Sequence, residues 1–219
     1  VIRATVAGLT SHVCVCDVDY VGPMFEVRIH GRGGQGVVTA AELLSYAAFE
    51  EGRHAQAIPS FGSERTGAPV VAFCRVSEHP IRTRESVLNP DAVVIQDATL
   101  LQSMDVFAGL KPDGYVLINS TKNFDELGLS DLLEGRPPGR VMTIPATDIA
   151  KEYIGRPVPN AVLLGGLAAL TGRFSTDNVA KGLNRKFSGR VAEGNIAAAN
   201  YAYDLVKWYL NEAKEEAHV

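Results

Sequence analysis

Three glycines and an arginine form the stretch of this sequence with the clearest chemical potential. Gly31, Gly33 and Gly36 match the spacing G-x-G-x-x-G, and Arg32 lies between the first two. Such a turn, placed after a strand and before a helix, is typical of nucleotide-binding sites, because the first backbone N–H groups of a helix are unpaired and attract phosphate. We therefore predict a ligand-binding turn with these candidate residues: Gly31, Arg32, Gly33, Gly34, Gln35 and Gly36.

The same spacing is also compatible with NAD binding, or with a tight turn that binds no ligand. An NAD site requires an acidic residue about 20 positions later, at the end of the second strand, to hold the ribose hydroxyls. The predicted second strand, residues 54–58, ends in Pro59 and Ser60 instead. The nearest acids are Glu50 and Glu51 before the strand and Glu64 after it, so NAD is disfavoured.

Two further groups have residue types suited to chemistry. Glu64 and Arg65 are adjacent in a loop rich in glycine and proline that follows the second strand, and we include both among the candidate binding residues. A solvent-exposed ion pair is the alternative interpretation. His30 ends the predicted first strand beside the turn, where it is either a general acid/base or a locally hydrogen-bonded strand residue.

Composition excludes several classes of function. The chain has 219 residues, a net charge of −4 and three cysteines, and no run of 18 apolar residues. This composition argues against nucleic-acid binding and against a membrane span, and three cysteines are too few for a four-thiolate iron–sulfur cluster. The histidines lack metal-ligand spacing, so we expect no metal and no catalytic residue of a hydrolase type. We expect a reduced, cytoplasmic protein.

The positions of apolar runs and breakers predict an α/β fold. Strands are expected at residues 25–30, 54–58, 70–76, 91–97, 115–120 and 141–145, and the first helix at 35–51. Near-continuous apolar strands are typical of a parallel sheet covered on both faces. Residues 161–171 are small and apolar on all sides, which suits close helix packing or a subunit interface. The sequence therefore predicts a doubly wound, mostly parallel sheet with a helical C-terminal section. In such a fold ligands bind at the carboxyl ends of the strands, where we expect the glycine turn, the loop after Ile58 and the strand ends at Asp97 and Asn119–Ser120 to converge.

The first 23 residues differ from the rest. They are apolar but contain Asp17 and Asp19, and they lack the basic start of a secretion signal. We expect residues 1–23 to be an N-terminal extension, disordered or not native, with Met24 as the natural start. Residues 24–219 are then a single domain.

Two stretches together resemble a known family. The first is His30-Gly-Arg-Gly-Gly-Gln-Gly-Val-Val-Thr-Ala-Ala-Glu42, and the second is Phe61-Gly-Ser-Glu-Arg-Thr-Gly-Ala-Pro-Val70. Both look like the gamma subunit of 2-oxoacid:ferredoxin oxidoreductases. The segment Pro159-Asn-Ala-Val-Leu-Leu-Gly165 follows in the expected order. The resemblance covers residues 24–208. The two motifs are more similar to those of the pyruvate and 2-ketoisovalerate types of this family than to those of the 2-oxoglutarate type.

The resemblance implies an enzyme subunit that is inactive alone. Such an enzyme decarboxylates a 2-oxoacid oxidatively with coenzyme A, giving acyl-CoA, CO2 and reduced ferredoxin. The resemblance implies alpha, beta and delta partner subunits, with thiamine diphosphate and 4Fe–4S clusters held by those partners, and coenzyme A as co-substrate. For this chain itself the resemblance leaves two roles open. One is coenzyme A binding at the glycine turn, with Arg32 and Arg65 as cations. The other is a purely structural interface role.

Overall fold

The computed structural model describes residues 24–59 and 66–216, so the predicted extension at 1–23 lies outside the described residues. The strands are β1 (Phe25–Arg32), β2 (His54–Pro59), β3 (Pro69–Ser77), β4 (Ala92–Ile95), β5 (Tyr115–Asn119) and β6 (Val141–Ile144). The helices are α1 (Val37–Glu50), the 3₁₀ helix η1 (Ala98–Gln102), α2 (Ser130–Leu133), α3 (Ala146–Ile154), α4 (Asn160–Thr171), α5 (Thr176–Lys186) and α6 (Gly189–Glu216).

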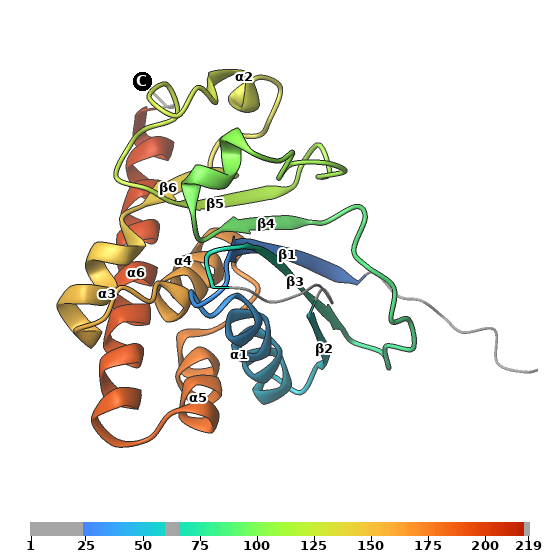
Figure 1. The fold of residues 1–219 in the computed structure, drawn as a ribbon, viewed down its shortest axis with the longest axis vertical. Helices are drawn as coiled ribbons and strands as arrows, with labels where there is room; N and C mark the ends of the chain where they lie inside the picture. The colour runs from blue at the N-terminus through green and yellow to red at the C-terminus, as the bar shows by residue number, and fades with distance from the viewer. Residues whose placement is uncertain (1–23, 60–65, 217–219) are drawn as a thin grey trace, which may run out of the picture.

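The strands form one sheet in the order β2-β3-β1-β4-β5-β6 (Figure 1). Strands β1, β4, β5 and β6 pair in parallel, whereas β3 is antiparallel to both β1 and β2. The predicted α/β fold with a mostly parallel sheet and a helical C-terminal section is confirmed. The parallel strands end on the same edge of the sheet, which therefore collects the turns after β1, β4 and β5.

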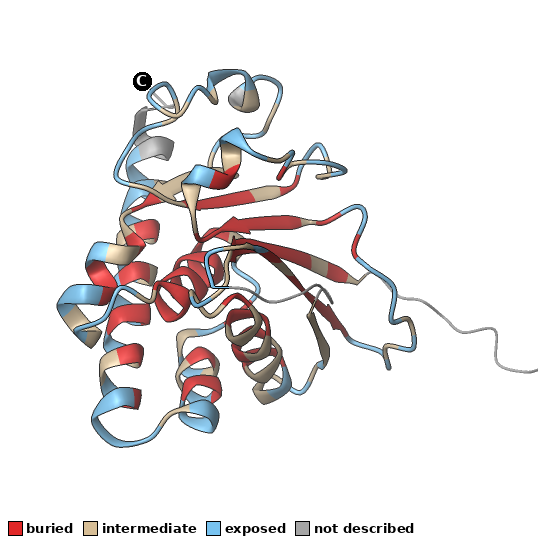
Figure 2. Ribbon diagram, viewed as in Figure 1, coloured by how far each residue is buried: buried red, intermediate tan, exposed pale blue. Residues whose placement is uncertain are grey.

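The two faces of the sheet have different coverings, because side chains alternate along each strand. Val27, Ile29 and Val94 face the larger core with α1, α4 and α6. Val93 and Ile95 face a smaller core that includes Leu100 of η1. The burial colouring in Figure 2 shows the central strands and α4 as the buried interior of the molecule.

Helix α4 is the centre of the C-terminal section. Every side chain from Asn160 to Leu170 is buried within this chain. A Cβ atom on Gly165 would lie 2.0 Å from the backbone oxygen of Ala199 on α6, so only glycine allows the two helices to approach this closely. Of the two roles predicted for the small apolar residues 161–171, close helix packing accounts for their burial.

The predicted boundaries on either side of the glycine turn were each wrong by two residues. Strand β1 continues past His30 to Arg32, because Gly31 and Arg32 still pair with Val70 and Pro69 of β3. Helix α1 begins at Val37 rather than Gln35, because Gly36 adopts a left-handed conformation that a helix cannot contain. His30 is therefore an interior strand residue, and Gln35 belongs to the turn.

Candidate functional site

The turn between β1 and α1 requires glycine at particular positions for two reasons. Gly34 and Gly36 have φ angles of 93° and 74°, which residues with side chains rarely adopt. Gly31 has a different constraint, since a Cβ atom there would lie 2.6 Å from the Cγ2 atom of Val37. The turn therefore holds the start of α1 tightly against the end of β1.

The start of α1 is an uncapped helix N-terminus. Gly36 provides no side chain to cap it, and its first turn contains no acidic residue. No described residue accepts a hydrogen bond from the backbone N–H groups of Val37, Val38 or Thr39. Unpaired N–H groups at the positive end of a helix dipole attract an anionic group, as the sequence predicts for this turn.

Arg32 is already bound within the protein. Its Nε atom lies 3.2 Å from the Asp97 carboxylate, its Nη2 atom donates to the Thr99 hydroxyl at 2.7 Å, and its Nη1 atom donates to the Gly67 carbonyl at 3.0 Å. The guanidinium thus joins the glycine turn to the start of η1. Of the donors predicted at this turn, the backbone N–H groups at the start of α1, and not this side chain, are left free for a ligand.

Gln35 completes this network. Its Oε1 atom accepts a hydrogen bond from the backbone N–H of Arg32 at 2.8 Å, and its Nε2 atom donates to Asp97 at 2.8 Å. Burial acts to raise the pKa of Asp97, but the hydrogen bonds from Thr99 and Gln35 and the charge of Arg32 outweigh it, and the net shift is downward. Asp97 is therefore a carboxylate that fixes the turn.

The loop after β2 also reaches the turn. Gly33 donates to the carbonyl of Ala68 at 2.9 Å, and Gly67 donates back to the carbonyl of Gly33 at 3.1 Å. The predicted site residues Glu64 and Arg65 lie outside the described residues. Their neighbours Thr66 to Ala68 lie against the turn, so the loop and the turn share one edge of the sheet, as predicted.

His30 is unsuited to proton transfer at this edge. Its side chain is only 4% exposed. Burial, followed by the positive charge of the nearby Arg28, lowers the pKa of His30 from 6.5 to about 4. The imidazole is thus a neutral, buried group near neutral pH. A general acid/base role for His30 is therefore disfavoured. His30 also does not lie at the end of its strand, since β1 continues to Arg32.

The strand order gives a second reason why NAD binding is disfavoured. In the nucleotide-binding arrangement the second strand lies directly beside the first. Here β3 lies between β1 and β2, and it runs antiparallel to both. The acids before β2 are engaged elsewhere, since Glu50 pairs with Arg185 at 2.6 Å and Glu51 pairs with Arg53.

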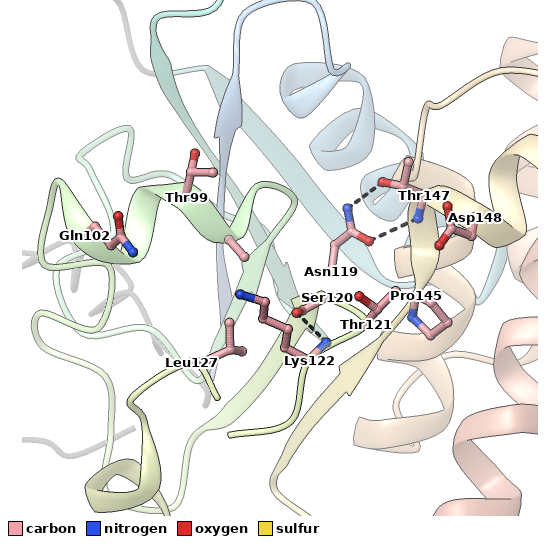
Figure 3. Close-up of a pocket in the computed structure, with 11 residues that line it drawn as sticks. Thr99, Gln102, Asn119, Ser120, Thr121, Lys122, Leu127, Pro145, Thr147 and Asp148 are labelled. Atoms are coloured by element: carbon pink, nitrogen blue, oxygen red, sulfur yellow. Dashed lines mark hydrogen bonds between the residues drawn. The ribbon is translucent and has the colours of Figure 1, made fainter. Parts of the chain in front are cut away.

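A pocket of about 360 Å³ opens on the same edge of the sheet, beyond the ends of β4, β5 and β6 (Figure 3). Asn119 forms one wall and holds two elements together. Its Nδ2 atom donates to the carbonyl of Gln96 at 2.8 Å and to the hydroxyl of Thr147 at 2.7 Å, and its Oδ1 atom accepts from the N–H of Thr147 at 3.0 Å. The remaining lining residues are Ala98, Thr99, Gln102, Ser120, Thr121, Lys122, Leu127, Pro145 and Asp148.

Thr99 connects this pocket with the glycine turn. It lines the pocket, and its hydroxyl also accepts the hydrogen bond from Arg32. Sequence reasoning identified the strand ends at Asp97, Asn119 and Ser120 but missed Thr99, Lys122 and Thr147. The sequence did contain a signal for Thr99, because it follows Asp97 by two residues, which is the spacing of a side-chain helix cap. In the structure the Asp97 carboxylate accepts a hydrogen bond from the N–H of Thr99 at 3.0 Å.

The described part of the chain contains neither a cluster of metal-ligating side chains nor a membrane-spanning helix. No group of three or more histidine, cysteine, aspartate or glutamate side chains there is arranged to hold a metal ion. Among the described helices, none combines the length and the apolar character needed to cross a membrane.

Comparisons with known proteins agree on one family. A family model described as pyruvate ferredoxin/flavodoxin oxidoreductase matches residues 26–205. The chain is 47% identical over 184 residues to the pyruvate synthase subunit PorC of Methanothermobacter marburgensis, across 84% of this chain and 98% of the relative. It is 45% identical over 186 residues to the pyruvate/ketoisovalerate oxidoreductases common subunit gamma of Thermococcus kodakarensis, across 85% of this chain and 99% of the relative.

A solved structure has the same fold. The pyruvate oxidoreductase subunit PORC of Thermotoga maritima superimposes with a TM-score of 0.68 and 35% sequence identity. The match covers 83% of this chain and 96% of that chain, so the similarity extends over nearly the whole relative.

Proposed function

Because the chain belongs to the pyruvate ferredoxin/flavodoxin oxidoreductase family, as a gamma subunit of its multi-subunit 2-oxoacid:ferredoxin oxidoreductases, we propose that it binds coenzyme A at the turn between β1 and α1. The enzyme releases CO2 from a 2-oxoacid, passes the electrons to ferredoxin and transfers the acyl group to coenzyme A. We propose pyruvate as the 2-oxoacid, because both relatives above are named for pyruvate.

The observation that carries the coenzyme A proposal is the free N-terminus of α1. Coenzyme A contains a diphosphate, and the unpaired N–H groups of Val37, Val38 and Thr39 are suited to bind such a group. The missing acidic residue in the first turn supports the proposal, since an acid there would repel the phosphate. Arg32 then acts by fixing the turn, because its guanidinium already has three partners.

The described residues support the proposal that other subunits hold the redox cofactors. Among the described residues the one cysteine is Cys74, which is fully buried in β3, and burial raises the pKa of its thiol to about 12. A protonated, enclosed thiol is a poor cluster ligand. We therefore propose that alpha, beta and delta partner subunits hold thiamine diphosphate and the 4Fe–4S clusters, and that the complex reduces ferredoxin in the cytoplasm.

Thr39 offers a sharp test of the coenzyme A proposal. The substitution Thr39→Glu places a carboxylate in the first turn of α1, where it stabilises the helix by about 0.3–1 kcal/mol but repels phosphate. The neutral variant Thr39→Gln has the same size without the charge. In the assembled enzyme we expect the KM for coenzyme A to rise about tenfold or more in Thr39→Glu, and by much less in Thr39→Gln.

The KM for the 2-oxoacid serves as the internal control, since the proposal leaves it unchanged in both variants. An assembled Thr39→Glu enzyme with an unaltered KM for coenzyme A would refute binding at this turn. Weakened assembly with unaltered coenzyme A dependence would favour the structural interface role instead.

A further inference from the structure

Strand β2 forms one free edge of the sheet. It is the last strand in the order β2-β3-β1-β4-β5-β6, and within the described part of the chain it pairs with β3 alone (Figure 1). The edge of a sheet presents unpaired N–H and C=O groups, to which a strand of another chain can bind. With six residues, β2 has the usual length of a paired strand, so its edge is long enough for such an addition.

The hydrogen bonds of β1 show how the backbone groups of this half of the sheet are oriented. The carbonyl group of Glu26 accepts from the N–H of Asp91, and that of His30 accepts from the N–H of Gln96. Both bonds lie on the β4 side of β1. Because backbone groups alternate between the two sides of a strand, the odd-numbered residues of β1 form their ladder bonds with β3.

The pairing registers carry this alternation through β3 to β2. Cys74 lies opposite an odd-numbered residue of β1 and bonds to β1, so its neighbour Arg75 bonds to β2. Arg75 lies opposite Gln56, which therefore bonds to β3. The residues on either side, Ala55 and Ala57, direct their N–H and C=O groups to the open edge. No described residue forms a hydrogen bond with these outward groups.

This edge lacks the features by which natural proteins keep a strand edge from pairing. The sequence of β2 is His-Ala-Gln-Ala-Ile-Pro, which contains no lysine, arginine, aspartate or glutamate, and its one proline is the last residue. Two copies of β2 therefore meet without repulsion between like charges.

The outward groups are complementary to those of a second copy. A two-fold rotation about Gln56 places Ala55 opposite Ala57 of the second copy, and Ala57 opposite Ala55 of the second copy. Each of these two pairs exchanges two hydrogen bonds in an antiparallel ladder, so the contact contains about four. The same rotation places His54 opposite Ile58 of the second copy.

An apolar pocket lies where the strand of the second copy ends. This pocket of about 630 Å³ is lined by Arg53 and His54 and, from other segments, by Phe49 and Ile81. The Phe49 side chain is 59% exposed, so more than half of its surface is open to a partner. In the two-fold register Pro59 of the second copy lies opposite Arg53, at the wall of this pocket. Apolar contact there supplements the backbone hydrogen bonds, which is required because a strand pair alone is only marginally stable.

We propose that β2 binds β2 of a second copy of this chain, antiparallel and around a two-fold axis at Gln56. The two six-stranded sheets then form one continuous sheet. In the enzyme this contact joins two gamma subunits. The proposal is independent of coenzyme A binding, since it involves neither the glycine turn nor the start of α1.

Analytical ultracentrifugation of the purified full chain tests the proposal. The wild type should sediment as a dimer of 23.5 kDa chains. Ala57→Pro removes an outward N–H group without removing a ladder bond to β3, and proline is tolerated at such edge positions. This variant should raise the Kd of the dimer about tenfold or more, because the dimer loses two hydrogen bonds by symmetry. Ala57→Ser keeps the N–H group and should dimerise as the wild type does.

Two double variants test the register with an unaltered backbone, and they decide the question if Ala57→Pro does not fold. His54→Glu with Ile58→Lys places opposite charges across the contact, because these two positions face each other in the two copies. His54→Lys with Ile58→Lys places like charges at the same positions. The Kd of the second double variant should exceed that of the first by about fivefold or more. Circular dichroism checks that each variant is folded.

Three results would overturn the proposal. One is a wild-type chain that remains monomeric at concentrations up to about 100 μM. Another is a dimer whose Kd is the same in the wild type, in folded Ala57→Pro and in both double variants, since the copies would then meet through another surface. The third is a monomeric chain whose Ala57→Pro variant assembles poorly with the other subunits, because the edge of β2 would then bind a strand of a partner subunit instead.

Discussion

The Nε atom of Arg32 lies 3.2 Å from the carboxylate of Asp97, which joins the turn after β1 to the residue that begins η1. These two residues are 65 positions apart, but Arg32 ends β1 and Asp97 follows the end of β4, its parallel neighbour in the sheet. The ion pair therefore fixes the relative position of the glycine turn and the adjacent pocket. Its direct contribution to stability is limited by the exposure of Arg32, whose side chain is 29% exposed.

Gln35 is expected to stabilise this junction. The substitution Gln35→Ala removes the hydrogen bonds to the Arg32 N–H and to Asp97, and should lower the free energy of unfolding by about 1–2 kcal/mol. Urea denaturation of the full chain measures this change. Gln102→Ala is the control, because this exposed side chain has no described hydrogen bond and should change stability by less than about 0.5 kcal/mol. Equal effects of the two substitutions would contradict the assigned role of Gln35.

Replacing Gly31 or Gly34 by alanine should destabilise the protein for a different reason in each case, and a second substitution can separate the two reasons. Gly31→Ala places a methyl group 2.6 Å from Val37 Cγ2 and should cost about 1–3 kcal/mol. Gly34→Ala meets no atom within 4 Å, and its cost of about 1–2 kcal/mol comes from its φ angle of 93°. Adding Val37→Ala should partly offset the cost of Gly31→Ala but not that of Gly34→Ala. If the changes in the free energy of unfolding were strictly additive for both double variants, the steric explanation would be refuted.

Buried His30 predicts a defined pH dependence of stability. Its pKa is about 4 in the folded protein and about 6.5 when unfolded, so between these values the unfolded chain binds the additional proton. The contribution of His30 is therefore fully present above pH 6.5 and is lost as the pH falls towards 4. Its size is on the order of 3 kcal/mol.

The measurement is the free energy of unfolding of wild type and His30→Leu between pH 4 and pH 7. The free energy of unfolding should fall less towards low pH in His30→Leu than in the wild type, and the difference should equal the contribution of His30. His54→Gln, at an exposed position of β2, should keep the wild-type slope. A His30→Leu protein with the wild-type slope would contradict the burial argument.

Local patterns were sufficient to predict most elements of the fold. Continuous apolar runs located β4 and β5, and glycine spacing located the turn that precedes α1. The convergence of that turn with Asp97 and Asn119 followed from the rule that parallel strands end on one edge. The order of strands was not predictable, because the residues of β3 specify an apolar strand but not that it lies between β1 and β2, antiparallel to both.

The site was predicted less completely than the fold. Gly31 and Gly36 were identified from spacing, and the structure supplies a physical reason for each. Arg32 was expected to bind a ligand, but its contacts with Asp97 and Thr99 depend on a residue pairing that spacing alone does not reveal. Lys122 gave no signal, because a lysine in a polar surface segment has the same local pattern whether or not it lines a pocket.

The most direct test of this account is affinity purification of the natural protein from cell extract, with mass spectrometry and a ferredoxin-reduction assay of the purified material. A gamma subunit should co-purify with thiamine-diphosphate-binding and ferredoxin-like chains. The purified complex should have the brown colour of iron–sulfur clusters and should reduce ferredoxin only when pyruvate and coenzyme A are both present. A colourless chain that purifies alone and binds NAD would contradict the account.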